Sequence, residues 1–260
     1  MKVVKVDLPS DIKDNKLILF PLSDLHLEDA HCDVKSFKLW IEKVKNTENG
    51  YVILLGDLLN TALKNSKSDV YSSTMSPQKA LDYLVELLEP IKDKILCSTG
   101  GNHEGRLMKD SSFSLGRMIA KDLGIEENYS DEPIMLYISF GKSKGRDCRK
   151  QIVSVFCTHN AGGGGKKIGS KMNTLESLES IIDADIYIGG HVHTPSIFNK
   201  SFYRSNLRNK KLMLVDKLFC NTGSWLLYGG YGANAGYCPA TIKTPVITVD
   251  GYSKSIKGTL

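Results

Sequence analysis

Residues 183–194 read DADIYIGGHVHT, a short apolar run followed by two glycines and by two histidines one residue apart. A short apolar run of this kind is typical of a buried strand. In open α/β sheets, ligand-binding groups gather where the strands end, and glycine lets the backbone approach a ligand closely. The stretch therefore predicts a buried strand that delivers His191 and His193 to a functional site.

Four other apolar runs end in a similar way. Residues 16–22 lead into SDLHL, residues 51–55 into GDLLN, residues 94–100 into GNHEG, and residues 151–156 into CTHN. Five of the six histidines lie in these five motifs, and only His31 lies outside them. Random placement does not explain that distribution. The sequence therefore predicts one shared site, built from the carboxyl ends of several strands.

Other segments carry apolar residues three and four positions apart, and they predict helices at 34–46, 76–90, 112–124 and 173–183. The first half alternates strand and helix, whereas the second half is richer in strands, with a hairpin expected around a loop at 141–150. Residues 60–74 and 199–211 are expected to be long loops. No shift in composition divides the chain, so we predict an α/β fold in a single domain over residues 1–260.

The composition narrows the class of protein. Hydrophobic residues make up 41% of the chain, enough for a core, and the net charge of +5 permits an anionic substrate without requiring nucleic acid. The six cysteines include no C-x-x-C pair, so nothing signals a zinc ribbon or a redox motif. The charged N-terminus lacks the pattern of a signal peptide, and no apolar run approaches the ~20 residues that cross a bilayer. These features predict a cytoplasmic protein without a membrane partner.

Each motif alone has a simpler structural explanation. Asp24 and His26 are two residues apart, so on an extended strand they would share a face, but a D-x-H triplet is a weak signal. Asp57 could be a helix cap or a turn residue, and His159 a hydrogen-bonded histidine at a strand end. The GNHEG and GGHVHT motifs are more specific, because packing alone does not explain their composition.

Taken together, the motifs indicate metal binding. Carboxylate, amide oxygen and imidazole ligands suit manganese, iron or zinc better than the all-oxygen sites of calcium and magnesium. The candidate ligands are too many for one tetrahedral ion. Two ions about 3.5–4 Å apart, bridged by one carboxylate, would use them, and that arrangement catalyses displacement at phosphorus.

The order D-x-H, G-D, G-N-H-E, strand-end His and G-H-x-H resembles the calcineurin-like metallophosphoesterase superfamily. The resemblance implies a four-layer α/β/β/α sandwich. It also implies two divalent transition metal ions, manganese in the first place and iron or zinc as alternatives, with a metal-bridged water or hydroxide as the nucleophile. By position, the implied ligands are Asp24, His26 and His193 for the first ion, Asn102, His159 and His191 for the second, and Asp57 as the bridge.

The same resemblance implies that His103 stabilises charge or protonates the leaving group without binding metal. Family members often have an acidic residue or a histidine three positions after the bridging aspartate. This chain has Asn60 there. The sequence therefore leaves open which group supports His103.

A phosphate ester is the expected substrate. A phosphodiester, from nucleic acid or a nucleotide, is favoured because the chain is too short for a capping domain after His193 and carries basic loops. The candidate substrate contacts are Lys64, Lys166 and Lys167, and two further basic runs at 142–150 and 204–211 have solvated loops as their simpler explanation. Two alternatives stay open: a phosphomonoesterase acting on phosphoprotein or a small nucleotide, and a binding scaffold with an inert site. The sequence does not indicate the oligomeric state.

Overall fold

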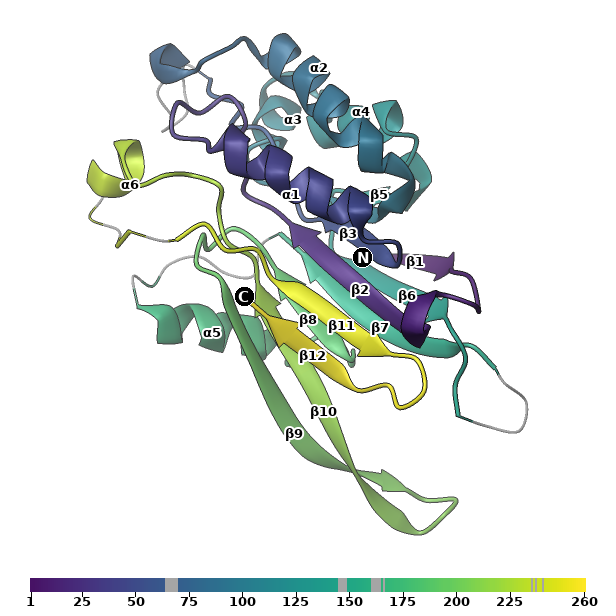
Figure 1. Cartoon of the computed structure of the whole chain (residues 1–260). Coiled ribbons are helices and arrows are strands. Elements are labelled where there is room, and N and C mark those ends of the chain that lie inside the picture. Colours follow the sequence, from purple (N-terminus) through teal and green to yellow (C-terminus); the bar gives the residue numbers. More distant parts are fainter. Residues whose placement is uncertain are drawn as a thin grey trace.

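The structure, a computed structural model, describes residues 1–63, 70–144, 149–159, 165, 167–234, 236, 238–239 and 241–260. These residues form two six-stranded sheets that pack face to face, with helices on both outer faces (Figure 1). The expected four-layer α/β/β/α sandwich is therefore confirmed. None of the described helices is long and apolar enough to span a bilayer.

The first sheet has the strand order β12-β11-β2-β3-β4-β5. Its middle strands β2, β3 and β4 are parallel, whereas β11 runs antiparallel to β2. Their carboxyl ends therefore lie along one edge of the sheet. The strands are β2 (Lys16–Leu22), β3 (Gly50–Leu54), β4 (Ile95–Thr99), β5 (Tyr129–Ser130), β11 (Val246–Asp250) and β12 (Ile256–Thr259).

The second sheet has the strand order β1-β6-β7-β8-β10-β9. Here β7, β8 and β10 are parallel, and β9 forms an antiparallel hairpin with β10 at the sheet edge. The strands are β1 (Lys2–Asp7), β6 (Ile134–Phe140), β7 (Gln151–Thr158), β8 (Ile186–Gly189), β9 (Ser196–Asn206) and β10 (Lys211–Asn221).

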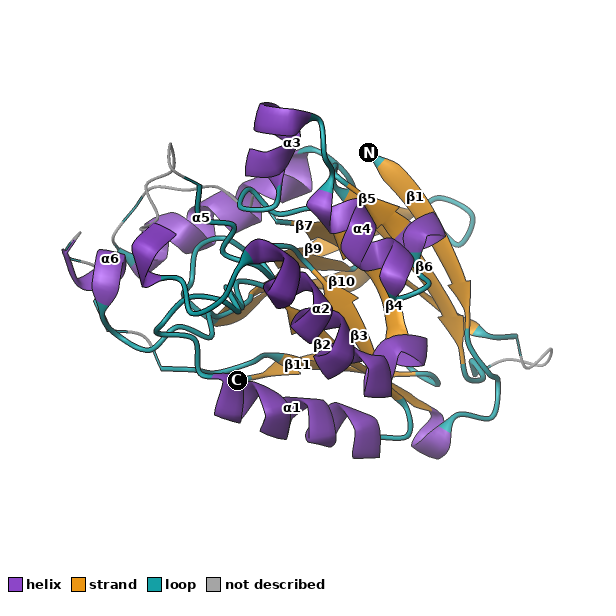
Figure 2. Cartoon of the chain, turned by 90° about the horizontal axis from the view of Figure 1, so that it is seen from above, coloured by secondary structure: helices purple, strands orange, loops and turns teal. Residues whose placement is uncertain are grey.

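Helices cover the outer face of each sheet (Figure 2). The first sheet is covered by α1 (Val34–Asn46), α2 (Pro77–Leu88) and α4 (Leu115–Asp122), and α5 (Ile168–Ser177) covers the second. Short helices α3 (Gly105–Ser111) and α6 (Gly230–Asn234) lie in connections. Single 3-10 turns lie at Lys13–Asn15, Val70–Ser72, Glu89–Lys94, Glu126–Asn128 and Leu178–Ser180.

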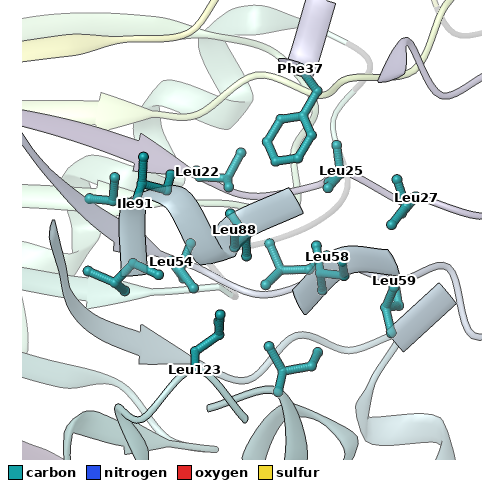
Figure 3. Packing of buried hydrophobic residues seen from close by; sticks show 14 of the residues in the cluster. Leu22, Leu25, Leu27, Phe37, Leu54, Leu58, Leu59, Leu88, Ile91 and Leu123 are labelled. Atoms are coloured by element: carbon teal, nitrogen blue, oxygen red, sulfur yellow. The ribbon is translucent and has the colours of Figure 1, made fainter. Parts of the chain in front are cut away.

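Three apolar clusters hold the layers together. Residues such as Leu19, Ile53 and Val155 fill the space between the two sheets and are fully buried. A second cluster lies beneath α1, α2 and α4, where Phe37 and Leu88 pack on the first sheet (Figure 3). A third lies beneath α5. Burial of this apolar surface fixes the two sheets relative to each other, and with them the strand ends that carry the motifs.

The sequence predicted most of these elements. The helix predicted at 76–90 is α2, which Ser76 caps and which has Pro77 in its first turn, and β6 and β7 form the expected hairpin. Two predictions were wrong. Residues 199–211 are not a long loop, because most of them belong to β9, whose polar and basic composition concealed an eleven-residue strand paired with β10. Helix α5 begins at Ile168, five residues before the apolar spacing starts at Asn173.

Candidate metal centre

The loops that follow β2, β3 and β8 hold unusual backbone conformations. The φ angles of Asp24, His26, Asp57, His191 and His193 are 52°, 49°, 51°, 72° and 53°. A non-glycine residue in this left-handed region is uncommon and costs free energy, and such residues concentrate at functional sites. Five of the seven predicted ligands are therefore held in conformations that the rest of the fold must impose.

Apolar residues interleaved with the ligands anchor these loops. Leu25 and Leu27 alternate with Asp24 and His26, and both leucines are buried in the cluster beneath the helices (Figure 3). The expectation that Asp24 and His26 share the face of an extended strand is wrong, because β2 ends at Leu22. Their side chains still lie together, since the buried leucines turn the residues between them toward the opposite side.

Asp24, His26 and His193 form one group whose ligand atoms all lie within 4.8 Å of one another. The Nε2 atom of His193 lies 3.0 Å from Oδ1 of Asp24 and 3.3 Å from Nε2 of His26. Asp24 and His26 are buried, whereas the side chain of His193 is 39% exposed. Residues from the two sheets, 167 positions apart in sequence, thus meet in one cluster.

Asp57, His159 and His191 form a second group with the same spacing. Oδ2 of Asp57 lies 3.0 Å from Nε2 of His159, and the same nitrogen lies 2.9 Å from Oδ1 of Asn102. The rings of His159 and His191 are 5.3 Å apart. The structure therefore brings the seven predicted ligands together, with Asn102 beside His159, and places His191 and His193 in different groups. A third group with the same spacing joins His26 and Asp57 to His103.

The two carboxylates share a distinctive hydrogen-bonding pattern. Oδ2 of Asp24 accepts hydrogen bonds from the backbone N–H of His191 and from Ser23, and Oδ1 of Asp57 accepts one from the backbone N–H of His103. The other oxygen of each carboxylate is buried, and the histidine nitrogen that lies 3.0 Å from it can donate to it only when that nitrogen is protonated. Burying a charged oxygen without a donor is costly. A divalent cation between that oxygen and the imidazole nitrogens removes the cost, so the residues fit metal ions.

The titration behaviour of these groups has the same cause. Burial favours the neutral form of Asp24, but the adjacent His193 and His159 outweigh it and lower the pKa of Asp24 to about 2. Burial likewise lowers the pKa of His159, but the Asp57 carboxylate outweighs it and raises that pKa to about 9. Without metal, protons on the imidazoles therefore balance the buried carboxylates, in the positions that cations would take.

A buried carboxylate that the sequence did not assign holds the loop of Asp57. Glu104 accepts hydrogen bonds from the backbone N–H groups of Asp57, Leu58 and Leu59, at 2.9, 2.7 and 3.1 Å. A Cβ atom at Gly101 would collide with the backbone of Asp57, so only glycine permits this approach. The final Glu of the GNHE motif thus positions the Asp57 loop and is not part of either metal group.

The segment NTGSW at 221–225 holds the loop of Asp24 in a similar way. The Thr222 hydroxyl lies 2.5 Å from that of Ser23, which itself donates to Asp24. The backbone N–H of Trp225 donates to the carbonyl of Asp24 at 3.1 Å, and the Trp225 ring is buried beneath the helices. The segment at 221–225 therefore positions Asp24, a predicted metal ligand.

His103 is supported by the backbone of Asn60. Its Nδ1 lies 2.7 Å from the Asn60 carbonyl oxygen, so this nitrogen carries the proton and donates it. Nη1 of Arg106 donates to the same carbonyl at 3.0 Å, and Nη2 of Arg106 lies 3.0 Å from Nε2 of His103. The family's usual side chain at position 60 is therefore replaced by a carbonyl oxygen. Arg106, three residues after His103, was not predicted from the sequence.

The lysines predicted to contact substrate are only partly described. Lys64 and Lys166 lie outside the described residues. Lys167 lies just before α5 with an exposed side chain. The nearby Lys171 donates to the carbonyl of Val192 at 2.8 Å and to the Thr194 hydroxyl at 2.5 Å, so it holds the GGHVHT loop.

The two basic runs lie far from the candidate centre. Of the run at 142–150, residues 145–148 lie outside the described residues, and the described ones connect to β6 and β7 at the end of β7 opposite to His159. The run at 204–211 lies at the turn between β9 and β10, ten residues along β10 from Asn221, or roughly 33 Å at the rise of a β-strand. The described residues of neither run therefore flank the site, and the preference for nucleic acid loses the support of these basic residues.

Known structures with a similar fold are distant in sequence. A predicted phosphoesterase from Streptococcus pneumoniae TIGR4 is 14% identical, with a TM-score of 0.37, over 94% of this chain and 97% of that one. Vps29 from Entamoeba histolytica, solved with Zn²⁺, is 12% identical, with a TM-score of 0.44, over 94% and 97%. Vps29 from Chaetomium thermophilum is 11% identical, with a TM-score of 0.41, over 94% of each chain. These likenesses are too distant to bear on function.

The curated proteins contain no sequence that matches this chain. The sequence model of the calcineurin-like phosphoesterase family, by contrast, matches residues 22–195, a span that begins at the end of β2 and closes just after the GGHVHT loop. That span contains both histidine groups, Asp57 and His103. The chain therefore belongs to the calcineurin-like phosphoesterase family.

Proposed function

We propose that the protein hydrolyses a phosphate ester at a centre of two divalent metal ions. One observation carries the proposal: Asp24 and Asp57 each direct a buried oxygen, which no described group other than an imidazole can pair, at the histidines of its own group. A structural carboxylate in a folded protein normally has both oxygens paired. Two such oxygens in adjacent histidine groups are the pattern of a metal site, which a scaffold with an inert site has no reason to retain.

The proposed ligands divide as the two groups do. Asp24, His26 and His193 would hold one ion, and His159, His191 and Asn102 the other, with Asp57 between them. The mixed nitrogen and oxygen donors suit manganese, iron or zinc, and we propose manganese as the first ion to test. Bound ions would neutralise phosphate charge and lower the pKa of a coordinated water, which supplies the nucleophile at neutral pH.

His103 would act on the leaving group. The Asn60 carbonyl fixes the proton on Nδ1, which leaves Nε2 as the atom directed away from the backbone. At rest Nε2 accepts a hydrogen bond from Arg106 and His103 is neutral, so Nε2 first takes up a proton from solvent as the Arg106 contact opens. That proton then passes to the leaving oxygen as the ester bond breaks, while Nδ1 keeps its hydrogen bond to Asn60. Arg106 is a positioning residue in this scheme, because it holds both the carbonyl and Nε2.

We propose a phosphodiester as the substrate, which would enter from the solvent-exposed side of the centre. Asn102 is exposed and His193 is partly exposed, so the two groups are reached from solvent on that side. His103, placed to protonate an alkoxide leaving group, suits a diester with a poor leaving group. The distant basic runs give no reason to require a nucleic-acid polymer.

A substrate panel tests the proposal. The metal-depleted protein is reloaded with manganese and assayed on bis(p-nitrophenyl) phosphate, p-nitrophenyl phosphate, cyclic nucleotides and single-stranded DNA. We expect the diester to be hydrolysed by the wild type and by His31→Gln, a control histidine outside both groups, and not by Asp57→Asn. Preference for the monoester would assign a phosphomonoesterase. Fewer than one bound ion per chain, with no turnover of any ester, would assign a scaffold.

A further inference from the structure

The β9–β10 hairpin extends beyond the rest of its sheet (Figure 1). Strand β8 pairs with β10 only from Leu218 to Asn221, so the part of β10 before Leu218 is paired with β9 alone. We call residues 201–216 the arm. A two-stranded ribbon without a covering layer is only marginally stable in water. Such a projecting ribbon is therefore expected to have a partner surface.

The arm exposes large apolar side chains. Its exposed apolar residues are Tyr203, Leu207, Leu212, Met213 and Leu214, with exposed fractions of 70%, 87%, 67%, 50% and 63%. The register puts Leu212, Leu214 and Tyr203 on one face, the same face as Leu218 and Cys220, which are buried between the sheets. The arm thus continues a core face into solvent, and a cluster of this kind marks an interaction site.

The same arm is strongly basic. The arm carries four cationic residues and a single acidic one, Asp216 at its base, and its turn carries Arg208, Lys210 and Lys211. Arg204 pairs with Asp183 at 3.0 Å, whereas the three cations of the turn form no ion pair with any described residue. The partner of the arm must therefore accept both apolar side chains and a cluster of positive charge.

We propose that the arm binds the surface of an anionic lipid bilayer. Leu207 would enter the acyl boundary, Tyr203 would lie at headgroup level, and the three cations of the turn would meet lipid phosphates. A second copy of the chain would bring like charges together at the turns. Nucleic acid would satisfy the charges and stack on Tyr203, but it would leave the four exposed leucine and methionine side chains of the arm in water.

This proposal is independent of the proposed function, because the turn of the arm lies roughly 33 Å along β10 from the candidate centre. It departs from the expectation that the protein has no membrane partner. That expectation rested on the lack of a bilayer-spanning apolar run. A hairpin that lies in the interface needs no such run, because its apolar residues enter only the outer boundary of the hydrocarbon.

Vesicle flotation of the full chain tests the proposal. We expect the protein to float with vesicles of equimolar phosphatidylcholine and phosphatidylglycerol and to remain unbound with phosphatidylcholine alone. The triple variant Arg208→Gln, Lys210→Gln, Lys211→Gln should bind the anionic vesicles about 100-fold more weakly. Leu207→Ser with Leu212→Thr and Leu214→Thr should weaken binding at least about tenfold. Leu39→Ser, at a comparably exposed leucine of α1, is the matched control and should bind normally.

Circular dichroism of each variant would establish that the fold is retained. Equal binding by the wild type and both arm variants would overturn the proposal. So would an arm-dependent dimer in sedimentation without vesicle binding, which would assign a second copy as the partner. Arm-dependent retardation of single-stranded DNA without vesicle binding would overturn it in favour of nucleic acid.

Discussion

Nη2 of Arg106 lies 3.0 Å from Nε2 of His103, whose Nδ1 lies 2.7 Å from the Asn60 carbonyl. A guanidinium can only donate hydrogen bonds, so Nε2 must accept, and the imidazole is neutral in this arrangement. The positive charge of the Arg106 guanidinium at that nitrogen also disfavours a metal ion there. The contact therefore supports the expectation that His103 serves the reaction without being a ligand.

The contact predicts how Arg106 tunes His103. Burial lowers the pKa of His103, the Asp57 carboxylate raises it, and Arg106 lowers it further. We expect Arg106→Met to raise the pKa of His103, measured by NMR titration of its imidazole protons, and to reduce kcat about 10- to 100-fold. Arg106→Lys should recover part of kcat. An unchanged His103 pKa in Arg106→Met would show that the arginine does not position this side chain.

The separation of His191 from His193 predicts the loss of different ions. His191→Ala and His193→Ala should each retain one of two bound manganese ions, measured by elemental analysis, and lose activity at least about 100-fold. Adding excess manganese should rescue neither variant fully. Loss of both ions from each variant would mean that the histidines serve a single coupled site, and His31→Gln should retain both ions in parallel.

The raised pKa of His159 predicts opposite pH trends with and without metal. Its pKa rises from 6.5 to about 9 in the metal-free fold, so the stability gained from its pairing with Asp57 is present below pH 6.5 and is lost as the pH rises through about 9. Over the same window, proton competition with metal weakens. As the pH rises from 6.5 to about 9, we expect the Tm of the metal-free protein to fall and the increase in Tm caused by manganese to become larger. A metal-free Tm that stays level between pH 6.5 and 9 would contradict this.

The loop held by Glu104 predicts a stability effect. In Glu104→Gln, an NH₂ group replaces one of the two carboxylate oxygens and cannot accept a hydrogen bond. At least one of the three buried backbone N–H groups therefore loses its partner. We expect a loss of about 1–3 kcal/mol in the free energy of unfolding, measured by urea denaturation of the metal-free protein. Glu126→Gln, which removes an exposed ion pair with Arg117, is the control and should cost less than about 1 kcal/mol. Equal effects would show that the Glu104 network does not stabilise the loop.

The candidate ligands were predictable because each follows a buried apolar strand, and parallel strands end at a common edge. The interleaving of Leu25, Leu27 and Val192 with polar residues is visible in the sequence too, because burial of alternate residues is a local pattern. The fold class followed from the alternation of strands and helices in the same way. These properties depend on near neighbours in the chain, which is why sequence patterns contain them.

The tertiary structure alone decided the rest. Only packing of the two sheets brings Asp24 within reach of His193, and only the assembled loops impose left-handed φ angles on residues that disfavour them. Arg106, Glu104 and Thr222 acquire their roles through contacts that no local spacing encodes. The β9 side of the arm was missed for the opposite reason, because a largely polar strand paired only with its neighbour lacks the apolar alternation of a buried strand. The local sequence pattern determines which residues lie at the ends of strands, and long-range packing determines which of them come into contact.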